Sequence, residues 1–352
     1  MSAFAGLPEQ PYAARMLDAA LARPAHAYLL SGPAGSGKRR HADRFAAAIL
    51  DTELGRVERR THPDLFVLEP EGQGILVEGA RRLRRDLHLR PYEAARRVYL
   101  ILDAHLLRDE SANALLKSIE EPPEYGVFVL VSDHARRMLP TILSRVQTVP
   151  FRRFPVGVLE QAVSEPVAAR AALGSLARAE ELAGDPAAAG RRRAYLELAR
   201  ASAADEAFDP ASAAAAVLAS TGERAKAEST RIGKEAAERL ASVDDPKERR
   251  ALEKRFDDRA KRAARRAEWD ELRLAVDTVG WWYRDLMAVG LGAGDSVVNS
   301  DVADDMSPAP AGAAGHAARA LEVVADVRRS LELNIHPGLG LEAMFHRLHQ
   351  AR

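Results

Sequence analysis

Asn113-Ala-Leu-Leu-Lys-Ser-Ile-Glu-Glu-Pro-Pro123 lies between two strongly hydrophobic segments, Val98-Tyr-Leu-Ile-Leu-Asp103 and Val127-Phe-Val-Leu-Val131. Both flanking segments have the length and composition of buried strands. Upstream, Gly32-Pro-Ala-Gly-Ser-Gly-Lys38 has the form of a phosphate-binding loop, and downstream the chain carries Ser144-Arg145. Together these four features predict an ATPase-type core built on a parallel sheet.

The first part of the chain alternates short hydrophobic runs with helical segments, which is typical of a parallel α/β sheet. The expected strands are residues 26–30, 64–68, 98–103, 127–131 and 147–149. The expected helices among them are residues 11–23, 39–50 and 77–89.

Strand signals fade after Pro155, and the rest of the chain has a helical pattern. Residues 223–273 are expected to form charged, exposed helices, residues 291–313 a flexible loop, and residues 331–345 part of one final helix. The predicted organisation has three domains. They are an α/β phosphate-loop domain at 1–155, a small helical lid at 156–202 and an all-α domain at 203–352.

Composition excludes several classes of function. The chain of 352 residues has a formal net charge of zero, so no overall field attracts it to nucleic acid or membrane. It has no cysteine, which excludes disulfides and thiolate metal sites. Residues 1–10 lack the pattern of a signal peptide, and no apolar run reaches the roughly 20 residues that span a bilayer. A cytoplasmic protein is expected.

The phosphate loop keeps its glycines and its lysine. Gly32, Gly35 and Gly37 would let backbone N–H groups converge on phosphate oxygens, and Lys38 would reach the terminal phosphates. The next position normally holds a Ser or Thr hydroxyl that binds Mg²⁺, but here it is Arg39. Two interpretations remain open: a site for weak ATP or ADP binding, and a strand–turn–helix whose glycines serve only the turn.

The second departure follows the strand that ends at Asp103. Such a strand usually ends in two acidic residues, one for the metal and one that orients the attacking water. Asp103 is present, but Ala104 replaces the second carboxylate. With both Arg39 and Ala104 in place, autonomous ATP hydrolysis is not expected.

Ser144-Arg145 follows a short helical segment, Leu139–Leu143. An arginine at the edge of a domain can reach a neighbouring subunit, and its guanidinium matches a γ-phosphate in charge and shape. An arginine supplied to another subunit's ATP site in this way raises the rate about 10³–10⁵-fold. A structural ion pair with a carboxylate is the alternative role.

These segments resemble the clamp-loader branch of the AAA+ ATPases. The similarity is dense over residues 1–155, loose over 156–290 and returns near 331–348. The most specific parts are Glu-Glu-Pro-Pro and Leu-Pro-Thr-Ile-Leu-Ser-Arg; the other matching segments are residues 26–38, 62–64, 87–91, 97–103 and 113–119.

The resemblance implies an AAA+ phosphate-loop domain, a helical lid and a C-terminal helical oligomerisation collar. It implies a non-motor subunit of a DNA polymerase III clamp loader, part of the polymerase holoenzyme, with Arg145 and Ser144 serving a neighbour's ATP site. The implied partners are the gamma or tau motor subunits, the delta subunit, the sliding clamp and, through the assembly, primed DNA; the implied location is the nucleoid-associated replisome. The alternative is an ATP-hydrolysing AAA+ motor of the loader or of a related replication or repair system.

Three departures from the family pattern are visible. The family often holds zinc with four cysteines before its His-Pro-Asp segment, whereas residues 51–61 contain none, so no zinc is expected. Val146 stands where a cysteine usually follows the arginine. Residues 184–189 offer no obvious nucleotide-sensing arginine, although Arg191–Arg193 lie close by.

Two further features have open roles. Seven arginines crowd one stretch and could contact DNA phosphates, or form a solvated or packed face: Arg81, Arg82, Arg84, Arg85, Arg90, Arg96 and Arg97. Trp281-Trp-Tyr283 is interpreted as core or subunit interface.

Overall fold

The computed structural model describes residues 3–4, 10–70, 74–241, 243–306, 312–332 and 336–351. The chain divides into two compact units, Met1–Glu180 and Glu181–Arg352. The three-domain division with boundaries after 155 and 202 stays a prediction.

The first unit contains a five-stranded sheet with the order β2-β3-β4-β1-β5, and every neighbouring pair is parallel. All five expected strands are confirmed to within two residues at each end. Their bounds are β1 Ala27–Ser31, β2 Leu65–Leu68, β3 Arg97–Ile101, β4 Gly126–Ser132 and β5 Gln147–Pro150.

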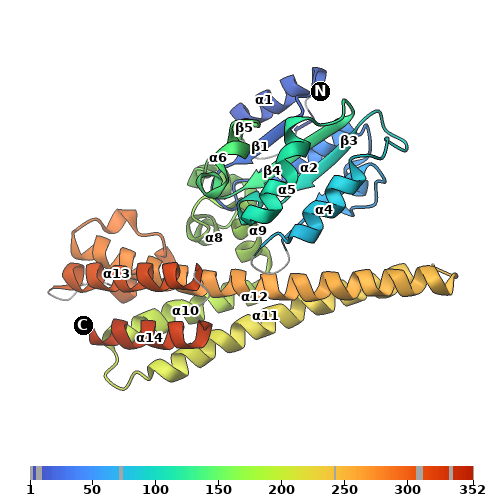
Figure 1. The fold of residues 1–352 in the computed structure, drawn as a ribbon. Helices are drawn as coiled ribbons and strands as arrows, with labels where there is room; N and C mark the ends of the chain where they lie inside the picture. The colour runs from blue at the N-terminus through green and yellow to red at the C-terminus, as the bar shows by residue number, and fades with distance from the viewer. Residues whose placement is uncertain are drawn as a thin grey trace. The chain divides into compact units, whose positions relative to one another are not determined.

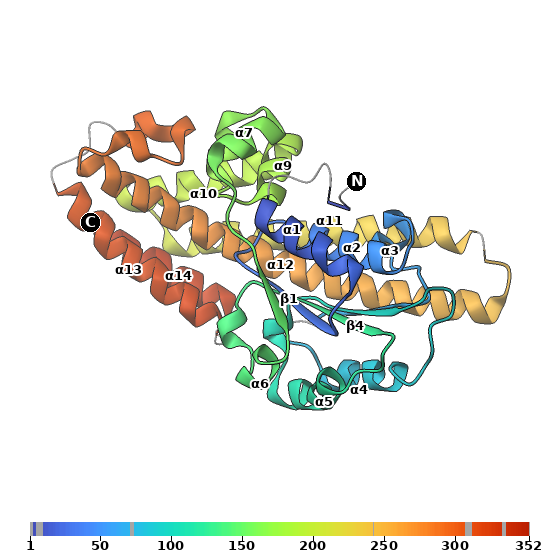
Figure 2. The same cartoon turned by 90° about the horizontal axis from the view of Figure 1, so that it is seen from above.

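Helices cover both faces of this sheet (Figure 2). Because adjacent strand residues point to opposite faces, Leu30 of β1 packs on one layer and Leu29 on the other. Burial on both faces explains why these strands are continuous hydrophobic runs. The layer on the Leu30 side holds α1 Pro11–Ala22, α2 Lys38–Ile49 and α3 Leu54–Glu58; the layer on the Leu29 side holds α4 Val77–Asp86, α5 Asp109–Glu120 and α6 Pro140–Leu143.

Parallel pairing places the carboxyl ends of all five strands at one edge of the sheet. The phosphate loop follows β1, Asp103 follows β3 and Asp133 follows β4. Two 3₁₀ turns, η1 Ala104–Leu106 and η2 Ala135–Arg137, lie directly after β3 and β4. The polar residues of the predicted site therefore come from three neighbouring connections at that edge.

A small helical segment completes the first unit. It consists of α7 Val156–Val163, α8 Pro166–Ala171 and the start of α9 Leu176–Gly184. Its own apolar cluster includes Phe154, Leu159 and Leu176.

The second unit is helical and has one core. In three of its helices the sequence Asp-Pro marks the start: Asp185, Asp209 and Asp245 each cap the first turn, and proline follows at the first helical position. The bounds are α10 Pro186–Ala204, α11 Pro210–Leu240, α12 Pro246–Gly290, η3 Gly294–Ser296, η4 Ser300–Met306, α13 Ala313–Glu332 and α14 Pro337–Gln350.

The core of this unit confirms the expected apolar stripe of α12. Leu272, Val276, Val279, Tyr283 and Leu286 are all buried in one cluster. Trp282 is buried there as well, so the core interpretation of the aromatic triplet holds for Trp282 and Tyr283.

The predicted fold class is confirmed: a parallel α/β sheet flanked by helices, followed by helical regions (Figure 1).

The expectation of one final helix over 331–345 was wrong, because Leu331 lies in α13 and Leu341 lies in a different helix, α14. Proline at the first position of α14 favours a new helix start there. Leu333 and Asn334 lie outside the described residues.

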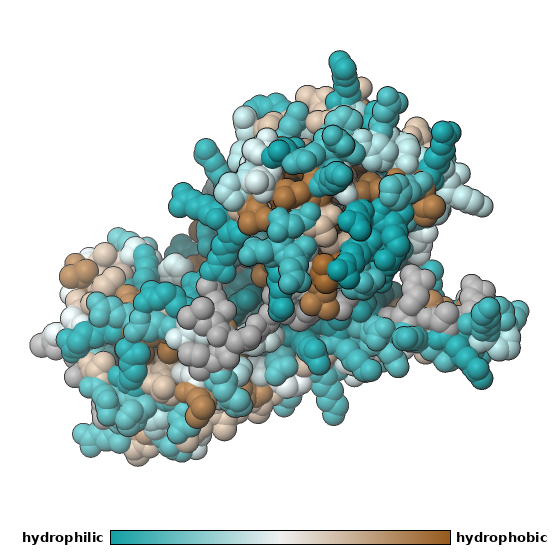
Figure 3. All heavy atoms as spheres, in the orientation of Figure 1, coloured by the Kyte–Doolittle hydropathy of each residue, from teal (hydrophilic) through white to brown (hydrophobic). Residues whose placement is uncertain are grey.

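Helices α11 and α12 lie side by side as a long hairpin (Figure 1). Ile232 and Phe256 are buried in this outer part, but most of its surface is hydrophilic on the face shown in Figure 3. Ion pairs such as Arg259 to Glu235, 2.8 Å apart, join the two helices. The charged segment 223–273 is therefore a helical hairpin, as expected.

Residues 291–306 are not the flexible loop that their composition indicated. Asp285, fully buried in α12, accepts hydrogen bonds from the backbone of Val298 at 3.1 Å and from the backbone and side chain of Asn299 at 2.9 and 2.8 Å. Arg192 of α10 donates to Asn299 at 2.7 Å and to both carboxylate oxygens of Asp301. This polar network fixes the segment against two helices, which no local pattern could reveal. Residues 307–311 lie outside the described residues.

We predict that Asp285→Ala lowers the free energy of unfolding of the second unit by about 3 kcal/mol, because it leaves buried donors without an acceptor. All three tryptophans lie in α12, so urea unfolding followed by tryptophan fluorescence reports on this unit. The matched control is Asp295→Ala, an exposed residue of the same segment, which should change stability by less than about 0.5 kcal/mol. Equal stability of the two variants would contradict the structural role of Asp285.

Candidate functional site

The phosphate loop between β1 and α2 depends on its glycines for backbone shape and packing. Gly35 and Gly37 have φ values of 72° and 83°, in the left-handed region that favours glycine. A Cβ at Gly32 would lie 2.4 Å from the carbonyl oxygen of Phe151. The loop therefore has the conformation expected from its sequence, with Lys38 as the first residue of α2.

Lys38 is almost fully buried, and its ammonium group is surrounded by oxygen atoms of this chain. It donates to the Pro33 carbonyl at 2.5 Å and to the Ser36 hydroxyl at 3.2 Å. The Asp133 carboxylate lies 2.8 Å away, and the Lys38 side chain is only 3% exposed. An ammonium group has three N–H donors, so these three oxygens can satisfy it completely.

The loop is also enclosed by chain from outside the β1–α2 connection. The backbone N–H of Leu176, at the start of α9, donates to the Gly35 carbonyl at 3.2 Å. A Cβ on Gly35 would lie 1.8 Å from the Ser175 hydroxyl oxygen, so this segment packs closely on the loop. On another side, the Gln10 amide donates to the carbonyls of Ser36 and Arg152 at 3.2 and 2.6 Å.

The two sequence departures have clear structural outcomes. Arg39 forms an exposed ion pair with Glu69 at 2.8 Å, after β2. Ala104 is buried at the start of η1 and offers only a methyl group. Asp103 has a left-handed backbone with φ of 50°. This set of donors does not fit Mg²⁺-dependent hydrolysis, since the metal-binding hydroxyl and the water-orienting acid are both replaced.

His105 adds a group that the sequence analysis did not single out. Burial lowers the pKa of its imidazole, against the opposing charges of the Asp103 and Asp133 carboxylates. The imidazole Nδ1 lies 3.4 Å from the Ser132 hydroxyl, and its ring packs edge-on against His134. Asp103, Asp133 and His105 therefore belong to one polar cluster at the carboxyl edge of the sheet.

Arg145 and Ser144 form a second, separate group. The guanidinium Nη1 donates to the Thr141 carbonyl and to the Ser144 hydroxyl, both at 2.9 Å. The Ser144 hydroxyl itself donates to Thr141 at 3.1 Å. The guanidinium Nε lies 2.9 Å from Glu120, and the Arg145 side chain is 39% exposed. Arg145 is thus half exposed but held by defined contacts.

The sheet separates Arg145 from the phosphate loop. Arg145 precedes the amino end of β5, whereas the loop follows the carboxyl end of the adjacent parallel strand β1. Tyr28 pairs with Gln147 and Ser31 with Pro150, so the paired region alone spans about 10 Å at 3.3 Å per residue. The predicted site residues therefore form two groups at opposite edges, and Arg145 does not approach its own loop.

The His62-Pro-Asp64 segment has a scaffolding role. Asp64, fully buried, accepts hydrogen bonds from the backbone N–H groups of residues 92, 93 and 94 at 2.6 to 2.9 Å. Burial alone would raise the pKa of Asp64, but these hydrogen bonds lower it overall. Arg97 is buried between Asp64 and Asp86, with guanidinium–carboxylate distances of 3.4 and 2.7 Å.

Including Arg97 in the basic cluster was therefore wrong. Of the other arginines in that cluster, Arg96 is partly buried, and five remain exposed: Arg81, Arg82, Arg84, Arg85 and Arg90.

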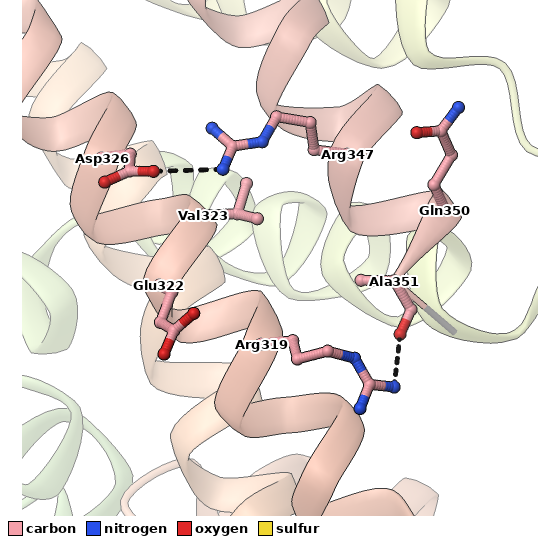
Figure 4. Close-up of a pocket in the computed structure, with 7 residues that line it drawn as sticks. All are labelled: Arg319, Glu322, Val323, Asp326, Arg347, Gln350 and Ala351. Atoms are coloured by element: carbon pink, nitrogen blue, oxygen red, sulfur yellow. Dashed lines mark hydrogen bonds and ion pairs between the residues drawn. The ribbon is translucent and has the colours of Figure 1, made fainter.

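Other candidate sites are weaker. An open depression of about 340 Å³ between α13 and α14 is lined by Arg319, Glu322, Asp326, Arg347 and a few neighbours, none of them predicted site residues (Figure 4).

Over the described part of the chain, no three His, Asp or Glu side chains are grouped as metal ligands. None of the described helices combines the length and apolar content of a membrane-spanning segment. The expectations about zinc and membrane stay predictions.

Residues 10–155 match the family model described as "DNA polymerase III, delta subunit". Over residues 10–155, the resemblance to clamp-loader subunits is confirmed. The chain is 32% identical over 154 residues to DNA polymerase III subunit delta' of Bacillus subtilis, and 41% identical over 138 residues to that of Pseudomonas aeruginosa. These matches cover 41% and 35% of this chain, and less than half of either relative, 47% and 42% of their lengths.

Relatives of the gamma/tau type also match. The DNA polymerase III subunit gamma/tau of Mycobacterium bovis is 32% identical over 170 residues, which are 44% of this chain and 29% of that protein. Among solved structures, a DNA polymerase III gamma subunit-related protein of Thermotoga maritima aligns with a TM-score of 0.49 and 16% identity, covering 97% of this chain and 100% of that one.

We predict that Lys38→Ala destabilises the first unit by about 3 kcal/mol without any nucleotide present, because it leaves the Asp133 carboxylate without its partner. Hydrogen exchange of the β1 and β4 amides measures this locally. Lys117→Ala, an exposed lysine of α5 in the same unit, is the matched control and should have little effect. Unchanged exchange in Lys38→Ala would show that this lysine is not needed for the fold.

Proposed function

We propose that this chain is a non-motor subunit of a DNA polymerase III clamp loader, which supplies Arg145 to the ATP site of a neighbouring motor subunit. In this role it helps the assembly load the sliding clamp onto primed DNA. The observation that carries the proposal is the position of Arg145: exposed, held by fixed contacts, and at the edge of the sheet opposite its own phosphate loop.

The chemistry of Arg145 supports action in another subunit. A guanidinium group pairs with phosphate oxygens through parallel N–H donors, which an ammonium group cannot reproduce. Because the paired region of β1 and β5 keeps Arg145 about 10 Å or more from the loop after β1, a phosphate that it binds must belong to a different molecule. Ser144 contributes by accepting one of the Nη1 hydrogen bonds.

The state of this chain's own loop supports a non-motor role. Lys38 already has three oxygen partners, Arg39 pairs with Glu69, and Ala104 offers no carboxylate. An incoming phosphate would have to displace Asp133 from Lys38, so ATP or ADP binding at Gly32, Gly35, Gly37 and Lys38 should be weak at most. The neighbouring Asp103 keeps one carboxylate at this edge, which alone does not make a hydrolytic site.

The contacts of the loop suit a rigid subunit. Motor AAA+ proteins must let helical segments move when nucleotide changes. Here the start of α9 is bonded to Gly35 through Leu176 and is packed on it through Ser175. We infer that the loop is retained as a joint between the sheet and the helices that follow it.

The proposed partners follow from the family relationship. They are gamma or tau motor subunits, the delta subunit, the sliding clamp and, through the complex, primed DNA. The C-terminal helical region would provide the oligomerisation surface. The protein would act in the cytoplasm with the replisome, as a component of the polymerase holoenzyme without ATPase activity of its own.

The alternative is a motor subunit that hydrolyses ATP. The intact glycine geometry of the loop and the similarity to gamma/tau proteins favour this alternative. Arg39 and Ala104 argue against it, and a rate measurement separates the two.

We expect the purified chain to hydrolyse ATP negligibly, because neither a Mg²⁺-binding hydroxyl nor a water-orienting acid is present. Steady-state ATPase measurements with Mg²⁺ provide the test. A turnover of about 1 s⁻¹, the low end of ordinary enzymes, that disappears in a Lys38→Ala chain whose hydrogen exchange shows it to be folded would establish the motor alternative instead.

Arg145→Ala should leave the chain folded and able to assemble, while it reduces the clamp- and DNA-stimulated ATPase of the reconstituted loader and slows clamp loading. The loss should be partial, because other motor sites keep their own arginines. Arg145→Lys should restore little activity, since lysine lacks the planar pair of donors.

The matched control for this experiment is Arg136→Ala, an exposed arginine in η2 of the same unit. It should behave like the wild type. Equal ATPase and loading rates for wild type and Arg145→Ala would show that Arg145 has only a structural role and would overturn the proposal.

A further inference from the structure

Glu120 occupies an electrostatically unfavourable position. It is the last residue of α5, and the negative end of a helix dipole disfavours a carboxylate there. Pro122 and Pro123 follow, so the helix ends at this point and the Glu120 side chain stays beside the end of α6. The Arg145 cation offsets the Glu120 carboxylate and the negative helix end, with Nε 2.9 Å from the Glu120 carboxylate.

Two of the three guanidinium nitrogens of Arg145, Nε and Nη1, contact other residues of this chain. Glu120 lies at Nε, while the Thr141 carbonyl and the Ser144 hydroxyl take both donors of Nη1. Within the described residues, Nη2 makes no hydrogen bond. Arginine binds phosphate best when its planar donors are fixed in advance, and the open Nη2 side is the one left for such a ligand.

We propose that Glu120 is a positioning residue for Arg145: it fixes the guanidinium so that Nη2 faces the phosphate of the neighbouring subunit. This inference rests on the proposed function and adds a specific role for the first glutamate of Glu120-Glu-Pro-Pro123. Glu121 provides the internal comparison, because it is adjacent and exposed and forms no ion pair with the arginine in the described structure.

The first test needs only the purified chain. In NMR spectra with labelled arginine, Glu120→Ala should speed the rotation of the Arg145 guanidinium, whereas Glu121→Ala should leave it unchanged. Glu120→Gln keeps an oxygen acceptor and should lie between wild type and Glu120→Ala. Identical behaviour of Glu120→Ala and Glu121→Ala would overturn the proposed restraint.

The second test uses loaders reconstituted with wild-type, Glu120→Ala, Glu120→Gln, Glu121→Ala, Arg145→Ala and Glu120→Ala/Arg145→Ala chains. We expect Glu120→Ala to cause at least about half of the ATPase loss that Arg145→Ala causes, because misplacement of a catalytic group by a small distance strongly lowers the rate. The double variant should equal Arg145→Ala, because Glu120 acts through the arginine. Glu120→Gln should recover part of the rate, and Glu121→Ala should match wild type.

The outcomes separate the two ideas. If Arg145→Ala has no effect, the proposed function itself fails. If Arg145→Ala slows the loader but Glu120→Ala does not, only the role of Glu120 fails. A faster loader with Glu120→Ala would also overturn it, because Glu120 would then hold the arginine away from the phosphate. A further loss when Glu120→Ala is added to Arg145→Ala would overturn it as well, because Glu120 would then act independently of the arginine.

Discussion

The buried ammonium group of Lys38 is the contact on which the arrangement of the first unit depends. A buried charge is costly unless it is paired and hydrogen-bonded, and Lys38 obtains its partners from the loop itself and from Asp133 after β4. The same loop holds the start of α9 through the Gly35 carbonyl. The connections that follow β1 and β4 and the start of α9 therefore meet at the phosphate loop. Lysine usually binds phosphate in such a loop, but here Lys38 stabilises the fold.

The charged groups of the first unit lie at two opposite edges of the parallel sheet. Its carboxyl edge carries Asp103, Asp133 and the phosphate loop, whose charges are largely balanced within the chain. Its opposite edge carries Arg145, whose Nη2 makes no hydrogen bond to the part of the chain that the structure describes. A sheet cannot be bent to bring these edges together, so one chain cannot use its own arginine on its own loop. Strand direction, rather than any flexible element, keeps Arg145 away from the loop of its own chain, and this separation is the reason for proposing that it serves another molecule.

Local sequence was enough to predict the strands and the glycine loop, because each depends on neighbours within a few residues. It failed where distant residues decide the outcome. The pairing of Lys38 with Asp133 joins residues 95 positions apart, and the order of residues 291–306 depends on Asp285 and Arg192. Arg97 was grouped with surface arginines because the acids that bury it, Asp64 and Asp86, come from other elements. Glu120 was visible in the sequence, but its contact with Arg145 was not.

The strand order also affects the chain while it is being made. β1 lies between β4 and β5, and both are synthesised much later, since β4 begins at Gly126 and β5 at Gln147. At roughly 5–20 residues per second, about five to twenty seconds pass on the ribosome before β1 can pair with β4. During that time the backbone N–H and C=O groups of β1, which pair with β4 and β5 in the final sheet, have no strand partner. The parallel sheet of the first unit can therefore be completed only late in synthesis, whereas the α11–α12 hairpin, built from neighbouring residues, can form as soon as it emerges.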